Sequence, residues 1–265
     1  MPADRSRRGE RGVALLMVLW GLVPLAVLFL ALSTTARSEA QAAFDLRAAA
    51  VLEAAADGAI HTAIFGLLAQ GGAPAPVVQA SGAGVTVEAI GLSGFVNPNT
   101  APAELLQALL TRVGAEPGRA KQVAAAIVDW RTPGQRAGAN GTKAAEYREA
   151  GLAYGPPGAP FESLDELGLV RGMDPFLLAA LAPSLSLYAY GPPDPQAASP
   201  LIRQALRDVG VSRGPGALVT QVYQVTAVAA GPSGTRAVRR ATIRIGPAPD
   251  GRGWRFLVWD TLQGQ

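Results

Sequence analysis

The hydrophobic and polar positions divide the chain into an apolar run, an amphipathic continuation and a longer mixed region. The run Val13–Leu32 has no charged side chain, and as a helix it spans roughly 30 Å, the thickness of a bilayer's hydrocarbon core. From residue 36 to 68, apolar residues such as Phe44, Leu52 and Leu67 recur at steps of three and four, up to a Gly- and Pro-rich break at 71–76. We therefore expect one long helix, half in lipid and half against a soluble domain.

Between residues 97 and 210 the pattern predicts mainly short helices. Strands are expected at Val85–Ile90 and at Leu185–Tyr190, and the Gly-rich segment Thr132–Pro160 is expected to be an unusually long loop. Caps and apolar spacing predict five helices. The first has Thr100 as its N-cap, and the second spans Gly118–Arg131 with Val123, Ile127 and Trp130 on one face. The third opens at the Ser163–Glu166 capping box, the fourth begins at Asp174–Pro175 and ends at Pro183, and the fifth runs from Ser199 to about Val209.

The C-terminal part alternates with a period of two, which predicts β structure. Three strands are expected, at Leu218–Ala229, Thr235–Ile245 and Trp254–Leu262, the first two joined by a hairpin turn at 231–234. An antiparallel meander on a long helix is a stable two-layer arrangement. The expected fold class is α+β: a long N-terminal helix packed on an antiparallel sheet, with a large inserted α-helical domain of roughly a hundred residues.

Composition narrows the possible partners and chemistry. The chain of 265 residues has no cysteine, which excludes disulfides, thiolate metal sites and cysteine nucleophiles. Its net charge is +3, and residues 1–12, with four arginines, one aspartate and one glutamate, hold +2 of it. A nucleic-acid-binding protein needs a concentrated basic face, and only Arg236–Arg255 comes near one. We therefore expect no nucleic-acid partner.

The N-terminus resembles that of type IV pilins and of the pseudopilins of type II secretion systems. The shared features are a short basic leader ending in Gly12, an apolar helix starting at once at Val13, and an amphipathic continuation. The resemblance implies that a prepilin peptidase cuts between Gly12 and Val13 on the cytoplasmic side and methylates the new N-terminus. A glycine fits such a site because a residue without a side chain lets the peptidase hold the backbone closely.

The apolar span is expected to stay as a single-pass anchor in the bacterial inner membrane. No A-x-A-like cleavage site follows it, and the arginines on its N-terminal flank place that end in the cytoplasm and residues 33–265 in the periplasm. The expected domains are a cleaved leader at 1–12, a transmembrane helix at 13–34, its periplasmic continuation at 35–70, a linker and first strand at 71–96, the inserted helical domain at 97–210, and C-terminal strands at 211–265.

The residue that sets the subunit register in this family is missing. Most pilins carry Glu at the fifth mature position, where it pairs with the N-terminal amine of the neighbouring subunit, but counting from Val13 this chain has Met17 there. Met17 avoids the cost of a carboxylate in lipid, but it cannot supply that pairing. Such a subunit suits the end of a filament, and an apolar fifth position is typical of the K-type minor pseudopilin.

Phrases in the soluble part are similar, in the same order, to segments of the K-type minor pseudopilins (general secretion pathway protein K): NPNTAPAELLQAL, AAAIVDWR, FESLDELGLVRGM and LAPSLSLY. With the leader and the C-terminal strands, the resemblance covers nearly the whole chain. It implies a subunit at the pseudopilus tip, partnered by the minor pseudopilins I and J and other pseudopilins. Such a subunit helps to start pseudopilus assembly for protein export across the outer membrane.

K-type relatives bind calcium through carboxylates that follow the Asp-Trp motif, which makes Asp129 and Glu146 weak candidate ligands here. Calcium prefers six to eight oxygen ligands, several of them anionic. Thr132, Pro133 and Gly134 stand where acidic residues are expected, so the site is depleted of carboxylates. Calcium binding therefore stays open, and no other cofactor is expected.

Enzyme activity is not expected, since no catalytic motif such as G-x-S-x-G, H-E-x-x-H or a P-loop occurs. The one histidine, His61, lies on the long helix and is expected to be solvated or hydrogen-bonded. Two alternatives to a pseudopilin stay open. One is a membrane-anchored periplasmic ligand-binding domain in which Gly12 has no role. The other is a DNA-uptake protein, because Leu110–Gly114 and Leu169–Met173 resemble helix-hairpin-helix turns.

Overall fold

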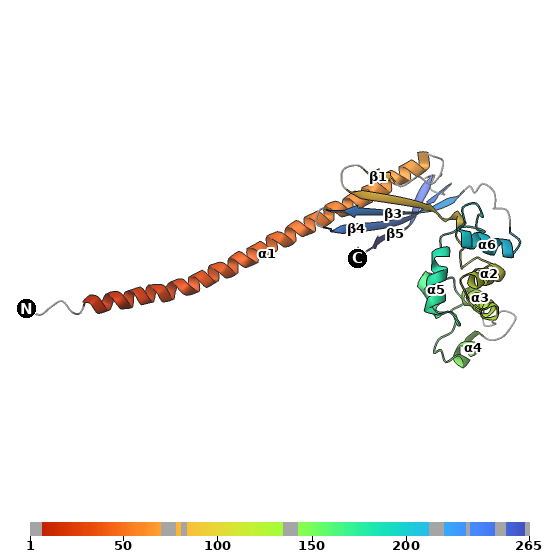
Figure 1. Cartoon of the computed structure of the whole chain (residues 1–265), viewed down its shortest axis with the longest axis horizontal. Coiled ribbons are helices and arrows are strands. Elements are labelled where there is room, and N and C mark those ends of the chain that lie inside the picture. Colours follow the sequence, from red (N-terminus) through yellow and green to blue (C-terminus); the bar gives the residue numbers. More distant parts are fainter. Residues whose placement is uncertain are drawn as a thin grey trace, which may run out of the picture.

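The computed structural model describes the backbone of residues 7–69, 78–80, 84–134, 143–211, 220–231, 234–246 and 253–262. Within these ranges the side chains of residues 7–15, 31–38, 40, 78–80 and 143–144 lie outside the description. A long helix, an antiparallel sheet and a helical insertion follow one another along the longest axis of the molecule (Figure 1).

One helix, α1 (Arg7–Ala69), runs from the N-terminal segment onto the sheet. Its 63 residues give it a length of roughly 95 Å, and Pro24 lies inside it without ending it (Figure 1). The single long helix is thus as predicted, but its expected start at Val13 is wrong. It begins six residues earlier, at Arg7, because the leader's Arg and Glu are good helix formers and extend the helix back through Gly12.

The sheet is antiparallel, and its strands follow the order of the chain: β1 (Val78–Ala80), β2 (Val85–Gly91), β3 (Gln221–Ala230), β4 (Arg236–Ile245) and β5 (Trp254–Leu262). The predicted strand near residues 85–90 and the three C-terminal strands are confirmed to within a few residues. The three-stranded meander is wider than expected, because β2 pairs along β3 from Val85↔Ala229 to Gly91↔Tyr223. The whole insertion therefore leaves and re-enters the sheet between two neighbouring strands.

The C-terminal half of α1 packs on β2, β3 and β4. Its buried positions form one stripe at helical spacing: Leu52, Ala56, Ala59, Ile60, Ala63, Ile64 and Leu67. Alternate strand residues form the other wall of this core: Val85, Val87, Tyr223, Val225, Ala227, Ala229, Ala241 and Ile243. The alanines on both sides let the helix and the sheet approach each other closely.

The insertion holds α2 (Ala103–Arg112), α3 (Pro117–Arg131), α4 (Lys143–Glu149), α5 (Pro175–Leu181) and α6 (Pro200–Asp208), with 3-10 helices η1 (Leu92–Gly94), η2 (Leu164–Leu169) and η3 (Ala182–Ser184). It has a hydrophobic core of its own, separate from that of the sheet. Val123, Ile127 and Trp130, predicted to share one face of α3, are all buried in this core.

Most of the predicted helix starts are confirmed by their caps. The side chains of Asp174 and Ser199 accept from the backbone N–H groups of Leu177 and Ile202, and the Ser163 capping box is present, although it opens a 3-10 helix. The predicted cap of α2 is wrong. Its N-cap is Pro102, while the N–H of Thr100 donates to the carbonyl of Asn97 in the preceding turn.

Two further predictions are wrong. Residues 185–190 form no strand: Leu185 makes one isolated parallel bridge to Val96, and the segment then continues as a turn. The segment 132–160 is not loop throughout, because α4 lies within it. Residues 135–142 of that segment lie outside the described chain.

Candidate functional site

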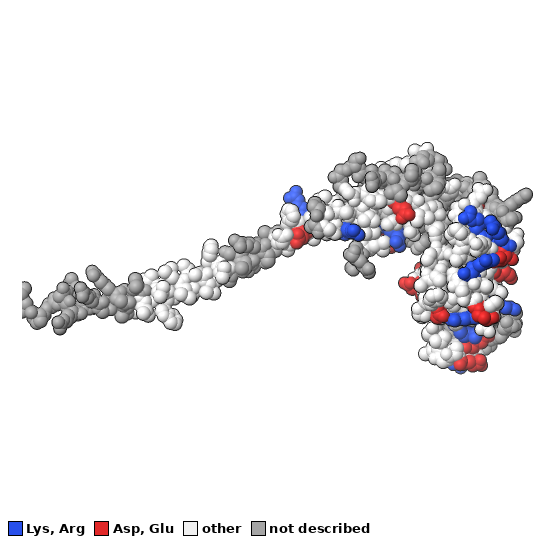
Figure 2. All heavy atoms as spheres, viewed as in Figure 1, with Lys and Arg blue, Asp and Glu red and all other residues white. Residues whose placement is uncertain are grey.

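The N-terminal half of α1 presents apolar side chains on all sides. Every side chain from Leu16 to Leu30 is exposed, and the two largest, Trp20 and Phe29, are 76% and 74% exposed. In Figure 2 the described part of this segment is a shaft without charged groups. A helix that is apolar all round is stable only where lipid or other apolar helices surround it.

Among the described residues, Gln41–Ala69 is the one segment long and apolar enough to cross a membrane, with a mean hydropathy of 1.4. However, 39% of its most apolar window is buried, because one face packs on the sheet. Leu16–Leu30 is a shorter described apolar helix, and no other described part of the chain covers it. Exposure therefore favours Leu16–Leu30, inside the predicted span 13–34, as the segment in contact with lipid.

The predicted processing and register residues all lie on α1. Gly12 and Val13 are in the helical backbone, although their side chains lie outside the description. Met17 is 70% exposed, one turn beyond them, in the apolar half. An uncharged, exposed side chain at this position can pack against apolar neighbours, but it offers no group for an ion pair.

Besides the stripe that packs on the sheet, α1 carries a second apolar stripe, which is exposed. Phe44, Val51 and Phe65 are 69%, 60% and 65% exposed, and with Gly58 they recur every seven residues. Phe44 was expected on the buried stripe, but it precedes the part of α1 that the sheet covers. A seven-residue apolar repeat is typical of a helix that packs along another helix. We call Phe44, Val51, Gly58 and Phe65 the outer stripe.

An arginine of the sheet ties α1 in place. The Nη2 of Arg239 on β4 donates to Glu53 at 2.9 Å, and its Nε donates to Asp57, one turn further along α1, at 3.0 Å. A third donor, Nη1, reaches the hydroxyl of Thr261 on β5 at 2.6 Å. The sequence analysis missed this cluster, because an Arg among alternating strand residues carries no local sign of a distant carboxylate pair.

The two asparagines of the NPN phrase, Asn97 and Asn99, hold segments of the insertion together. The amide nitrogen of Asn97, a buried residue, donates to the carbonyls of Leu187 and Ala189 at 2.9 and 3.0 Å. Asn99 pairs through both ends of its amide with the backbone of Phe161, at 2.7 and 3.0 Å. Two asparagines therefore fix three separate segments of the insertion, which explains the phrase without any ligand.

The calcium candidates lie in one region, but the residues do not fit the ion. Glu146 on α4 forms an ion pair with Arg171, and the Tyr147 hydroxyl accepts from the Arg171 backbone N–H at 3.0 Å. Burial raises the pKa of Tyr147, and Asp129 is close enough to raise it further. In the part of the chain that the structure describes, no group of three acidic or histidine side chains could hold a metal. The Arg171 guanidinium neutralises Glu146.

His61 lies on α1 against β5. Its ring centroid is 5.7 Å from those of both Phe256 and Trp259, the first in an edge-on arrangement. The expected solvation fits its exposed position, while the aromatic contacts were not predicted. The contacts give His61 a packing role between helix and sheet.

The two helix-hairpin-helix-like turns use their arginines within the insertion. Gly114 and Gly172 both have positive φ, at 105° and 85°, as such turns require. Arg112, beside the first turn, binds both oxygens of Asp208 at 2.7 and 2.8 Å. Arg171, beside the second, pairs with Glu146. Neither arginine is left to contact a phosphate, so nothing in these turns favours DNA binding.

Comparisons with known proteins point in one direction. Residues 80–190 match the family model described as type II secretion system (T2SS), protein K. Over 82 residues the chain is 34% identical to the type II secretion system protein K of Klebsiella pneumoniae, an alignment that covers 31% of this chain and a quarter (25%) of that protein.

The fold matches a solved structure over most of the chain. A chain in the crystal structure of the GspK-GspI-GspJ complex from the type 2 secretion system of enterotoxigenic Escherichia coli aligns with a TM-score of 0.60. The alignment covers 86% of this chain and 100% of that one, at 14% sequence identity. At this identity the match speaks for the shared architecture: a long helix, an antiparallel sheet and a helical insertion.

Proposed function

Because the chain belongs to the type II secretion system protein K family, we propose that it is a minor pseudopilin at the tip of a type II secretion pseudopilus. The observation that carries the proposal is α1 itself. The same unbroken helix is exposed and apolar over Leu16–Leu30 and forms the core of the sheet domain over Leu52–Leu67. A subunit built in this way is held by its N-terminal half in lipid, or among the helices of other subunits.

In this proposal the N-terminus is cytoplasmic and the sheet and insertion are periplasmic. The leader's arginines favour that orientation. The span 13–34 covers roughly 33 Å as a helix, enough for the hydrocarbon core of the inner membrane. The remainder of α1 then carries the sheet domain away from the membrane surface.

Processing by a prepilin peptidase requires the bond between Gly12 and Val13 to leave the helix and enter an active site. Both residues lie in α1, so the first turns of the helix must open. Glycine costs a helix about 1 kcal/mol relative to alanine, which weakens α1 at this bond. Gly12 therefore serves processing in two ways, by lowering the cost of opening and by permitting close approach of the enzyme.

Met17 supports a position at the end of the filament. In a subunit inside the filament, a carboxylate at this position pairs with a neighbour's N-terminal amine and offsets the cost of a charge in lipid. A subunit that starts the filament has no earlier subunit to pair with, so an apolar side chain is the less costly choice. The other minor pseudopilins, I and J, are the proposed partners, as in the complex of the matched structure.

The N-terminus of protein extracted from membranes tests the proposal. We expect intact-mass and N-terminal analysis to find Val13 first and methylated, and a Gly12→Ala variant to keep Met1. We also expect pseudopilins I and J to co-purify with the wild-type chain. Met1 retained in cells with an active prepilin peptidase would contradict processing. A processed chain that leaves both partners behind would contradict the tip position.

A further inference from the structure

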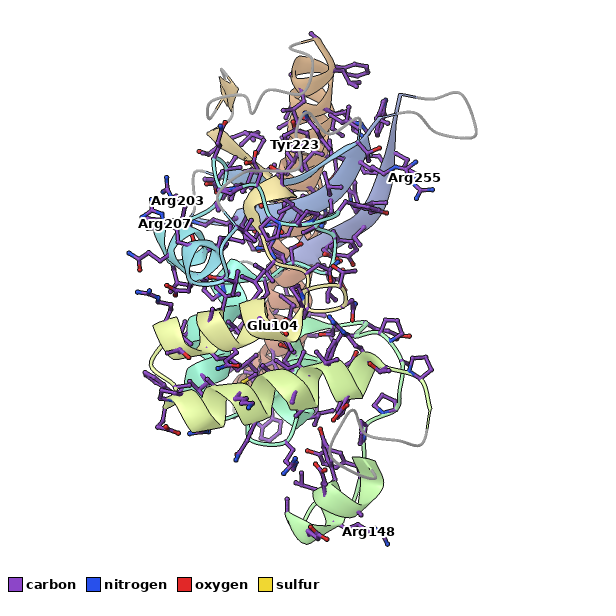
Figure 3. The ribbon with its side chains drawn as sticks, turned by 90° about the vertical axis from the view of Figure 1, so that its right-hand side faces the viewer. Glu104, Arg148, Arg203, Arg207, Tyr223 and Arg255 are labelled. Carbon is purple, nitrogen blue, oxygen red and sulfur yellow. The ribbon has the colours of Figure 1, made fainter. Side chains whose placement is uncertain are left out.

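Two arginines on α6 have no counter-charge among the described residues. Arg203 and Arg207 stand one helical turn apart and project side by side from α6 (Figure 3). Neither side chain forms a hydrogen bond or an ion pair with the described part of the chain, whereas the Arg112 side chain on α2 binds Asp208 of α6 at 2.7 Å. Figure 1 places α6 at the end of the molecule away from the N-terminus.

The nearby acidic groups are committed elsewhere. Asp194 and Asp208 are the only acidic residues between 194 and 211. Asp194 accepts from the backbone N–H of Gln196 at 3.0 Å inside its own turn, and Asp208 is held by Arg112. Residues 212–219 contain no Asp or Glu, so that segment brings no counter-charge either.

The insertion as a whole is not basic, so the two arginines do not reflect a general excess of positive charge. Residues 97–211 contain ten basic and eleven acidic side chains, yet basic groups gather near α6 on the face seen in Figure 2. Arg207 lies in the last turn of α6, where the helix dipole favours a cation. Arg203 lies in the middle of the helix, so the dipole does not explain it.

A pocket of about 280 Å³ lies between these arginines and the loop before α6, and it is lined by Pro195, Gln196, Arg203, Arg207 and Val211. Small-molecule sites usually enclose about 300–1,000 Å³, so this pocket suits one or two side chains of a partner protein. Pro195 and Val211 supply an apolar wall, and two guanidinium groups can each bind a carboxylate in bidentate fashion.

We propose that this α6 pocket docks an acidic segment of a partner protein, in which two carboxylates flank one apolar side chain. Charge complementarity and the apolar wall favour such a segment over nucleic acid, which needs a longer basic surface and contacts to successive phosphates. The inference does not depend on the proposed tip position, and it holds whether or not α1 is processed.

Fluorescence anisotropy with the full-length chain in a non-ionic detergent tests this proposal. The probe is a fluorescein-labelled peptide with the core Gly-Asp-Leu-Asp-Gly, and the control peptide has Asn in place of both Asp. We expect saturable binding of the acidic peptide that weakens with added NaCl. The Arg203→Gln/Arg207→Gln double variant should raise Kd roughly five- to thirty-fold. The Arg203→Lys/Arg207→Lys variant keeps the positive charge but lacks the planar guanidinium that binds a carboxylate in bidentate fashion. Its Kd should lie between those of the wild type and the double Gln variant.

Arg255→Gln is the matched control, because Arg255 is exposed on β5, away from α6 (Figure 3). It should leave Kd unchanged, and equal melting temperatures of all variants exclude misfolding. The proposal is overturned if the acidic peptide does not bind, if the Asn peptide binds as tightly, or if the double Gln variant binds as well as wild type. Saturable binding of inorganic phosphate that displaces the peptide would instead assign the pocket to phosphate groups.

Discussion

The guanidinium of Arg239 on β4 lies 2.9 Å from the carboxylate of Glu53 on α1, which joins two residues 186 positions apart. The Arg239 side chain is only 10% exposed, whereas Glu53 is 49% exposed. The arginine is therefore the member that depends on the pair, since Glu53 keeps much of its contact with water.

Replacing Arg239 should loosen the sheet from α1. We expect Arg239→Gln to lower the free energy of unfolding by about 1–3 kcal/mol, because two carboxylates and one hydroxyl lose their donor. Melting followed by tryptophan fluorescence measures the change, since Trp254 and Trp259 lie on β5. Arg236→Gln, on an exposed residue of the same strand, is the control and should have little effect. Equal melting temperatures for both variants would contradict a stabilising role for the contacts of Arg239 with Glu53 and Asp57.

Gly94, in η1 just after β2, packs tightly against the backbone of the segment before α6. A Cβ at this position would lie 2.4 Å from the carbonyl oxygen of Ala197, which is backbone and cannot swing away. We expect Gly94→Ala to cost about 1–3 kcal/mol in stability through forced backbone shifts. Gly253→Ala is the control, because nothing lies within 4 Å of its added Cβ. A Gly94→Ala variant as stable as wild type would show that the packing of Gly94 against Ala197 is looser than described.

The ion pair of Arg171 with Glu146 should make the insertion independent of calcium. We expect EDTA or added calcium to leave the melting temperature unchanged, and Arg171→Gln to lower the stability by about 1 kcal/mol. Lys121→Gln, which removes an exposed positive charge on α3, is the control. A rise of several degrees in the wild-type melting temperature with calcium would show that these carboxylates bind the ion after all.

Acid should destabilise the insertion. Backbone N–H donation from Leu177 holds the pKa of Asp174 below its ordinary value, and the Arg112 side chain does the same for Asp208. A carboxyl with a lowered folded-state pKa stabilises the fold above its unfolded pKa of about 4, and that contribution is lost as pH falls below it.

A variant with Trp130 as its only tryptophan reports this loss, because Trp130 is buried in the core of the insertion. We expect its emission to shift to longer wavelength as the pH falls below about 4. Asp208→Asn should make this dependence shallower, because it removes one of the titrating groups. The same acid profile in both proteins would rule out Asp208 as a source.

The outer stripe should matter for assembly and not for folding. Phe65 is 65% exposed, so Phe65→Ser should change the stability of the chain by less than about 0.5 kcal/mol. If neighbouring helices pack there, the same change should reduce co-purification of pseudopilins I and J and protein export. Phe176→Ser on α5, where the side chain is 73% exposed, is the control. Equal export by the two variants would contradict a role for the outer stripe.

Much of the fold could be predicted from local pattern. Asp174 and Ser199 indicate the starts of their helices, because an N-cap hydrogen bond joins residues only three positions apart. The strand predicted at residues 185–190 is wrong, because alternating apolar and polar residues form a strand only where a neighbouring strand can pair with them. There the side chain of Asn97 takes the carbonyls that a second strand would otherwise pair with.

The site residues divide in the same way. Met17 and the apolar span could be found by counting along the chain, because their proposed roles depend only on the distance from Gly12. Two features depend on segments far apart and left no local sign: the partners of Arg239 and the arginine that pairs with Glu146. The sequence analysis also missed the outer stripe and placed Phe44 on the buried one, because the pattern alone does not show where the sheet covers α1.

The continuity of α1 has a mechanical consequence. A helix roughly 95 Å long, with no break in its backbone, resists twisting far better than two helices joined by a loop. Any rotation of its apolar N-terminal half is therefore passed to the sheet through the packed core and the contacts of Arg239. The insertion, whose chain leaves the sheet after β2 and returns at β3, then turns together with the sheet.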